Sequence, residues 1–385
     1  MSSDQLHSNA PEHSNPWTVF LLFLRLGLTS FGGPVAHLGY FREEFVHRRR
    51  WLDEQGYADL VALCQFLPGP ASSQVGIAIG LLRGGYRGSL AAWTGFTLPS
   101  AIALALFALG VGRWGHSLPD GVLHGLKIVA VAVVAQAVWG MARNLCTDGP
   151  RIAIALLAAC AVLLLASAWA QLVVIAIAGL TGLLMFRPAA ASGLTPFQPR
   201  VSRTAGVVAL LLFFALLLLL PALAAVSSNQ LVAMVDSFYR AGALVFGGGH
   251  VVLPLLQAEV VPNGWVSNDT FMAGYGAAQA VPGPLFTFSA FLGASIGSGS
   301  SLINAALCLI AVFIPSFLLV FGAMPFWDRL RANRRMQAAL GGVNAAVVGL
   351  LLAALYDPVW TSAIFGPGDI VLAATALAAL MLWKL

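Results

Sequence analysis

The chain of 385 residues is too apolar for a water-soluble protein, because hydrophobic residues make up 59% of it, charged residues only 9%, and its mean hydropathy is +0.86. This composition predicts an all-α polytopic membrane protein with the lipid bilayer as its surroundings. The net charge of +5 comes from basic residues between apolar runs, which is the orientation bias of membrane proteins and argues against nucleic acid as a partner.

The chain begins with a polar tail, residues 1–15, that contains no Lys or Arg and is therefore not expected to be a cleaved secretory signal. The first apolar segment after it is interrupted at Phe31-Gly32-Gly33, with Arg25 six residues before the interruption and His37 shortly after it. Glycine allows backbone conformations that end a helix, so we expect a broken helix here.

A second interruption follows at Pro68-Gly69-Pro70. Gln65 precedes it, and Ser72 and Ser73 follow it. Arginines lie on both sides, in 42–50 and at 83 and 87, and loops rich in arginine stay in the cytoplasm. Residues 57–82 are therefore predicted to enter and leave the membrane on the same side, as a helical hairpin with Pro68-Gly69-Pro70 at its tip.

Apolar runs long enough to span a bilayer recur along the rest of the chain, with the shorter ones marginal. They are Leu90–Val111, Val122–Met141, Ile152–Ala168, Leu172–Phe186, Ala205–Val226, Leu302–Met324, Ala338–Tyr356 and Ile370–Trp383.

The second half of the chain repeats the interruptions of the first. Phe246-Gly247-Gly248 lies 215 residues after the first motif, and Pro282-Gly283-Pro284 lies 214 residues after the second. Arg240, Gln279 and Trp265 keep the places of Arg25, Gln65 and Trp51. One unit has therefore been duplicated.

Loop charges predict that the two copies face opposite sides of the membrane. Residues 42–51 carry four arginines, whereas the matching 259–269 carry no Lys or Arg. The expected fold has two inverted-topology repeats with broken helices and helical hairpins, divided into the first repeat at 16–187, a basic linker and connecting helix at 188–228, and the second, inverted repeat at 229–385. Counting some hairpins as single spans would give another number of helices.

Paired Gly/Pro interruptions at matching positions of two halves indicate the substrate site of a transporter, although a single such break is more often a kink. Each interruption precedes a helix start, whose free N–H groups and positive dipole end favour an anion. The hydroxyls of Ser72, Ser73 and Thr287 would add neutral donors.

Arg25 and Arg240 are expected to face the interior of the bundle and to hold an oxyanion through the guanidinium fork. The alternatives are an arginine that reaches the interface, or an ion pair between Arg240 and Asp236. His37 and His250 do not align with each other, and each is either a structural group or a contact for the anion or for a proton.

Gln65 and Gln279 either cap freed backbone or touch the ligand. Glu43 and Glu44, among the arginines, are expected to form a solvated cytoplasmic face.

Three motifs carry a resemblance to a known family: Ser30-Phe31-Gly32-Gly33-Pro34 with His37, Arg49-Arg50-Trp51, and Leu67-Pro68-Gly69-Pro70, with the same frame repeated later. Together they resemble the chromate ion transporter family of bacteria. The resemblance implies a multi-pass protein of the inner (plasma) membrane, with two oppositely oriented homologous domains, that exports chromate and confers resistance, with sulfate as the isosteric competitor. The second copy departs from the pattern, because Gly249 replaces the proline and no paired arginines precede Trp265.

The predicted function is export of chromate, and of sulfate as a second oxyanion, driven by the membrane potential or a proton gradient; the alternative is a weakly selective oxyanion channel. No phosphate-binding loop, catalytic cluster, metal site or cofactor site is indicated, which argues against an enzyme, and a homodimer is left open. The substrate-binding residues are expected to be Arg25, Phe31, Gly32, Gly33, His37, Gln65, Pro68, Gly69, Pro70, Ser72, Ser73, Arg240, Phe246, Gly247, Gly248, His250, Gln279, Pro282, Gly283, Pro284 and Thr287.

Overall fold

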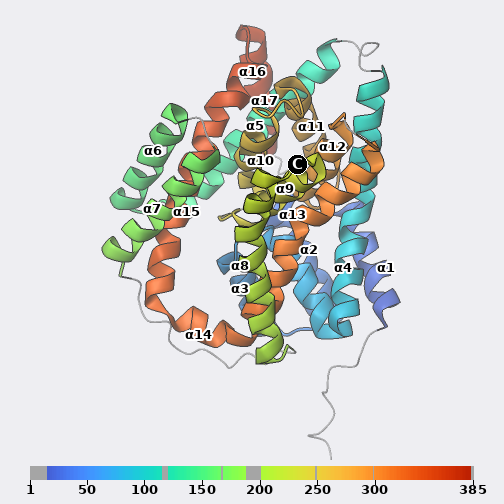
Figure 1. Ribbon diagram of the computed structural model, residues 1–385, viewed down its shortest axis with the longest axis vertical. Coiled ribbons are helices and arrows are strands. Elements are labelled where there is room, and N and C mark those ends of the chain that lie inside the picture. Colours follow the sequence, from blue (N-terminus) through green and yellow to red (C-terminus); the bar gives the residue numbers. More distant parts are fainter. Residues whose placement is uncertain are drawn as a thin grey trace, which may run out of the picture.

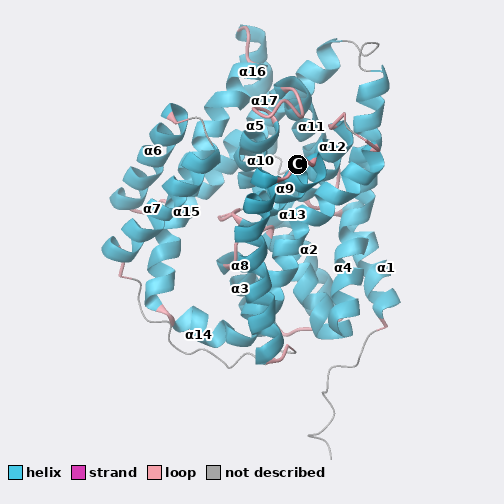
Figure 2. Cartoon of the chain, viewed as in Figure 1, coloured by secondary structure: helices cyan, strands magenta, loops and turns pink. Residues whose placement is uncertain are grey.

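The computed structural model describes residues 15–114, 120–165, 168–187, 201–247, 249–297 and 299–382. Every element in these ranges is a helix, which confirms the all-α prediction (Figures 1 and 2). Residues 1–14 of the predicted tail, 188–200 of the predicted linker, Gly248 and Trp383 lie outside the described residues.

The first half of the chain forms α1 to α7 and a short π-helical turn, η2. Their bounds are α1 Pro16–Thr29, α2 Gly33–Arg42, η2 Glu43–Arg48, α3 Glu54–Phe66, α4 Ala71–Trp114, α5 Asp120–Leu145, α6 Gly149–Leu164 and α7 Ala168–Met185.

The second half forms α8 to α17 with short 3-10 and π-helical turns between them. Their bounds are α8 Arg203–Val226, α9 Gln230–Ala243, η4 Gly249–Val251, α10 Val252–Val260, α11 Asn268–Ala280, η5 Leu285–Thr287, α12 Phe288–Ser295, α13 Ser301–Ala323, η6 Met324–Phe326, α14 Trp327–Ala332, α15 Arg334–Ala354, η7 Leu355–Trp360, α16 Thr361–Ala363 and α17 Pro367–Leu382.

Helix starts recur at matching places in the two halves. Asn15 and Asn229 are the N-caps of α1 and α9, and each side chain accepts a hydrogen bond from the backbone N–H two residues later. Asp53 and Ser267 are the N-caps of α3 and α11, and each side chain accepts a hydrogen bond from the backbone N–H three residues later. Because a side-chain oxygen at this position satisfies a free N–H of the first turn, the duplicated sequence starts the same helices twice.

The long helix α4 is folded back on itself. Gly84 and Gly85 have non-helical backbone angles, and Ser89 Oγ donates a hydrogen bond to the carbonyl oxygen of Ile77 over 3.0 Å. Residues 12 positions apart in a straight helix would be about 18 Å apart. The first part of α4 is therefore a separate helix, which leaves Pro68-Gly69-Pro70 as the non-helical link between it and α3, where the hairpin tip is predicted.

Five helical stretches are long and apolar enough to cross a membrane: Ala71–Arg113, His124–Leu145, Arg203–Val226, Ser301–Ala332 and Arg334–Ala363. The predicted runs in α6, α7 and α17 form shorter apolar helices. Leucines of α8 are widely exposed, with Leu218 at 72%. An apolar helix exposed to this degree needs lipid around it, so the chain is a multi-pass membrane protein.

Equivalent glycines let equivalent helices cross closely. A Cβ on Gly27 of α1 would lie 2.7 Å from the carbonyl oxygen of Phe96 in α4, and a Cβ on Gly242 of α9 would lie 2.1 Å from that of Val312 in α13. Figure 1 shows α1 beside α4 at one edge of the molecule, α6, α7 and α15 together at the other, and α9, α10, α12 and α13 between them.

Candidate functional site

All four interruptions adopt backbone conformations that favour glycine. The φ angles are +93° at Gly32, +73° at Gly33, +124° at Gly69, +75° at Gly247 and +107° at Gly283. A residue with a Cβ is strained in this region, so these positions end one helix and redirect the chain. Helical segments restart at Gly33, Ala71, Gly249 and Leu285, which confirms the predicted helix starts.

Each Pro-Gly-Pro segment is hydrogen-bonded to the Phe-Gly-Gly segment of the other repeat. The N–H of Gly69 donates to the carbonyl oxygen of Val245 over 2.6 Å, and the N–H of Gly283 donates to that of Ser30 over 3.0 Å. Ser30 and Val245 occupy matching positions, as do Gly69 and Gly283. The two hydrogen bonds are therefore equivalent: the first repeat donates one to the second, and the second repeat donates the other to the first.

Further contacts show the same reciprocity. A Cβ on Gly69 would lie 3.1 Å from Ser316 Oγ, and one on Gly283 would lie 2.8 Å from Ser100 Oγ, the matching serine of the first repeat. A Cβ on Gly249 would lie 3.3 Å from Pro34 Cγ, and these two residues also match. Such self-matching contacts are typical of a two-fold relation between units. We call the meeting place of the four interruptions the central junction.

His37 links the two interruptions of the first repeat. Its ring is 1% exposed, its Nε2 lies 3.2 Å from the carbonyl oxygen of Ser30, and its Nδ1 lies 3.4 Å from Ser72 Oγ. A carbonyl oxygen only accepts, so Nε2 carries the proton and Nδ1 accepts from the hydroxyl in the neutral ring. The second repeat has Val252 at this position, and His250 instead lies with its Nδ1 3.1 Å from Tyr275 Oη.

Polar side chains at the central junction satisfy freed backbone groups. Gln74 Nε2 donates to the carbonyl oxygen of Pro68 over 2.7 Å, and Thr287 Oγ1 donates to that of Pro284 over 2.7 Å. The single hydrogen of the Thr287 hydroxyl is therefore engaged, and Thr287 could donate to an anion only by releasing Pro284. Gln65 is exposed and Gln279 is half-buried.

Other hydroxyls near the central junction have no hydrogen-bond partner among the described residues. They are the Oγ atoms of Ser30, Ser73 and Ser316, all in side chains that are at most 2% exposed. Buried hydroxyls normally find a partner, so these three are free to donate to a ligand. Ser316 was not among the predicted site residues, although its match with Ser100 was visible in the sequence.

Arg240 is held by two acidic side chains. Its Nη1 lies 2.7 Å from Glu259 Oε1, and its Nη2 lies 3.1 Å from Glu259 Oε2 and 2.7 Å from Asp236 Oδ2. The Arg240 side chain is 11% exposed. The structure thus contains the ion pair with Asp236 that was the alternative for this residue, together with Glu259, which the sequence analysis missed.

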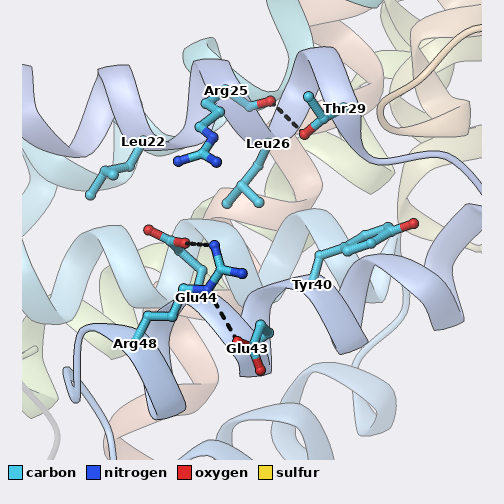
Figure 3. Close-up of a pocket in the computed structure, with 8 residues that line it drawn as sticks. All are labelled: Leu22, Arg25, Leu26, Thr29, Tyr40, Glu43, Glu44 and Arg48. Atoms are coloured by element: carbon cyan, nitrogen blue, oxygen red, sulfur yellow. Dashed lines mark hydrogen bonds and ion pairs between the residues drawn. The ribbon is translucent and has the colours of Figure 1, made fainter.

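Arg25 has different surroundings, and the expectation that it faces the bundle interior is wrong. Its side chain is exposed and lines an open pocket of about 130 Å³ between α1 and η2. Figure 3 shows it pointing from α1 toward Glu44 and Arg48, with no ion pair to either acid of η2. Those acids pair with other arginines, Glu43 with Arg48 and Glu44 with Arg48 and Arg49.

The expectation that Glu44 is solvated is also wrong, because its side chain is only 11% exposed and forms an ion pair with Arg49. Glu44 lies 215 residues before Glu259, so each repeat contains the same Arg and Glu positions. The same offset that matched Arg25 with Arg240 could have identified this second pair.

The remaining residues predicted to bind the substrate differ in how far they are buried. Phe31 is 52% exposed, Phe246 is half-buried, and Gly248 lies outside the described residues. Pro70 is buried in the first tip and Pro284 in the second, while Pro68 and Pro282 are half-buried.

The sequences of known proteins match most of the chain. The family description "Chromate transporter" matches residues 17–183 and 232–385, two stretches whose first residues are 215 apart. The chain belongs to the chromate transporter family. It is therefore a transporter with several membrane-crossing helices, as the motifs of the sequence indicated.

Individual relatives agree with this family. A chromate transport protein of Pseudomonas aeruginosa is 29% identical over 95% of this chain and 87% of its own length. An uncharacterized transporter of Methanocaldococcus jannaschii is 29% identical over 92% and 87%. A probable chromate transport protein of Synechococcus elongatus is 28% identical over 86% and 82%. No solved structure matches the chain.

Proposed function

We propose that this protein exports chromate from the cytoplasm across the bacterial inner membrane and that sulfate competes for the same site. The observation that carries the proposal is the central junction, where reciprocal hydrogen bonds bring the interruptions of both repeats together. Several helix starts and three free hydroxyls lie there, and such groups favour an anion with several oxygens. The names of the relatives point to chromate as that anion.

The proposed energy source is the membrane potential. Moving a dianion out of a cell with a negative interior releases about 4.6 kcal/mol per 100 mV, twice the value for one charge. A phosphate-binding loop of the ATPase type does not occur in the sequence. The inverted orientation of the repeats remains part of the proposal, with the two-fold axis of the central junction in the membrane plane.

A carrier fits the packing of the central junction better than a channel does. A Cβ on Gly69 would approach Gln74 Nε2 to 2.6 Å, and one on Gly283 would approach Ser100 Oγ to 2.8 Å. Segments packed this closely must move before an anion can pass, which favours alternating exposure of the site to the two sides.

Uptake of labelled chromate into inside-out vesicles tests this proposal. We expect saturable uptake that increases when the vesicle interior is made positive, is inhibited by sulfate, and is accelerated by unlabelled chromate on the opposite side. Uptake that rises linearly with concentration and shows no countertransport would support the weakly selective channel. Vesicles that take up no more chromate than those lacking the protein would contradict both.

A further inference from the structure

Glu259 occupies the place where an oxyanion would contact Arg240. Its two oxygens face the two terminal nitrogens of the guanidinium, at 2.7 and 3.1 Å. Tetrahedral oxyanions use the same two-pronged contact. As long as Glu259 is paired with both terminal nitrogens of Arg240, a dianion cannot make this two-pronged contact with the guanidinium.

A cavity adjoins this ion pair and is large enough for a small anion. Its volume is about 440 Å³, and Arg240, Glu259 and Gln171 line it together with residues of α6, α15 and η7. Asp236 does not line it. An anion entering the cavity would therefore meet Arg240 from the side that Glu259 now covers.

The charges around Arg240 do not balance. Asp236 and Glu259 face one guanidinium, and their side chains are only 7% and 10% exposed. Asp236 Oδ1 is buried and has no hydrogen-bond partner among the described residues, and Ser237 Oγ donates to Glu259 Oε2 over 2.9 Å. If Glu259 left Arg240 as a carboxylate, it would be a buried charge without a cation, which is costly unless it binds a proton.

Few other titratable groups face Glu259. Among the described residues they are Asp236 and Arg240 on α9, and Asp357 of η7, which lines the same cavity. Among the described residues, α7 and α15 line the cavity with Gln171 and apolar side chains.

In the first repeat the equivalent residues, Arg25 and Glu44, do not form an ion pair with each other. Glu44 is engaged with Arg48 and Arg49, and Arg25 faces an open pocket (Figure 3). The fold therefore accommodates an arginine at this position without its glutamate.

We propose that Glu259 is a proton-binding carboxylate that occupies the Arg240 fork in the empty transporter and leaves it, protonated, when an oxyanion binds in the adjoining cavity. The proton comes from the buffer acid of the bulk solution, reaches Glu259 through the open cavity and adds to a carboxylate oxygen, and the oxyanion takes the place of Glu259 on Arg240. This inference rests on the proposed function, and it couples one proton to each anion bound there.

Calorimetry of chromate binding to the purified full-length protein tests this inference at alkaline pH, where chromate is a dianion. Titrations in buffers of different ionisation enthalpy count the protons taken up. We expect about one proton per anion for the wild type, and a Kd that weakens about tenfold per pH unit. Glu259→Gln should take up none and should lose the pH dependence, whereas Glu259→Asp should keep both.

Glu54→Gln is the matched control, because Glu54 forms an exposed ion pair with Arg42 and does not line the cavity, and this variant should behave like the wild type. Chromate binding without proton uptake by the wild type, or equal uptake by Glu259→Gln, would overturn the inference and leave the proposed function standing. Loss of uptake in Asp236→Asn but not in Glu259→Gln would overturn the assignment to Glu259. If the wild type binds no chromate, the proposed function fails and this inference with it.

Discussion

At the scale of single residues, Arg25 and Arg240 hold matching positions in different surroundings. Arg240 is clamped by Glu259 and Asp236, whereas Arg25 faces a pocket and makes no ion pair with the acids that line it. An oxyanion would have to displace a carboxylate to reach Arg240 but not to reach Arg25. The guanidinium of Arg25 is therefore accessible to a ligand, whereas that of Arg240 is occupied by acidic side chains, and the matching sequence alone does not reveal this difference.

Replacing either arginine by lysine should reduce chromate transport about tenfold, because the charge remains but the two-pronged contact, worth ~1.5 kcal/mol or more, is lost. Initial uptake rates into inside-out vesicles measure this effect. Arg42→Lys is the control, since Arg42 pairs with Glu54 at the surface. Wild-type rates for both Arg25→Lys and Arg240→Lys at normal protein levels would remove the oxyanion role of these residues.

Gly69→Val and Gly283→Val should each lower transport about tenfold or more while the protein still inserts. A Cβ at either position meets a polar atom within 3 Å, and the positive φ adds strain of ~1–3 kcal/mol. Gly140→Val is the control, because a Cβ there has nothing within 4 Å. Normal transport by both tip variants would make the Pro-Gly-Pro segments structural and move the anion elsewhere.

Sequence reasoning found some of these residues and not others for a physical reason. Asp236 lies four residues before Arg240, so helix geometry alone suggested that pair. Glu259 comes from the far end of another helix, after a break that redirects the chain, and its approach to Arg240 depends on that tertiary turn. Glu44 was obscured by neighbouring arginines, whose charges resemble those of a solvated surface.

At the scale of helices, the order and the interruptions were predictable because glycine and proline act on their own backbone. The fold-back within α4 at Gly84 and Gly85, and the helix starts after each break, follow from local chemistry. The hydrogen bonds from Gly69 to Val245 and from Gly283 to Ser30 were not predictable, since they join residues of different repeats.

Gly242→Ala should destabilise the protein by ~1–3 kcal/mol, because its methyl group would press on the Val312 carbonyl and force α9 away from α13. Thermal unfolding in detergent measures the change. Gly125→Ala, where a Cβ has nothing within 4 Å, should unfold at the wild-type temperature or slightly above it. Equal midpoints for the two variants would show that the α9 and α13 crossing is not as tight as described.

At the scale of the whole molecule, reciprocal contacts relate the two repeats by an approximate two-fold rotation. Rotation alone does not say whether the axis runs along the membrane normal or lies in its plane. We propose that it lies in the plane, because residues 42–51 carry four arginines and the matching loop carries none, and loops rich in arginine stay in the cytoplasm.

Single cysteines at Gln55 and Pro262, in a background without the four native cysteines, should react with an impermeant thiol reagent from opposite sides of the membrane. Both positions are exposed. Gln55 lies in the first turn of α3, and Pro262 lies between α10 and α11, the equivalent helix of the second repeat. Labelling intact cells and inside-out vesicles separates the two sides. Reaction of both cysteines from one side would rule out the inverted arrangement.

The crossed hydrogen bonds at the central junction also bear on how such a protein could have arisen. A half-length ancestor folding alone would leave the Gly69 N–H without the carbonyl that now accepts from it, inside an apolar interior where such a group is costly, and the Ser30 carbonyl would keep only His37. Two copies related by a two-fold rotation would satisfy this N–H in both copies at once. Gene fusion would then have preserved an existing association, and the two halves, expressed from separate genes, should still assemble into one working molecule.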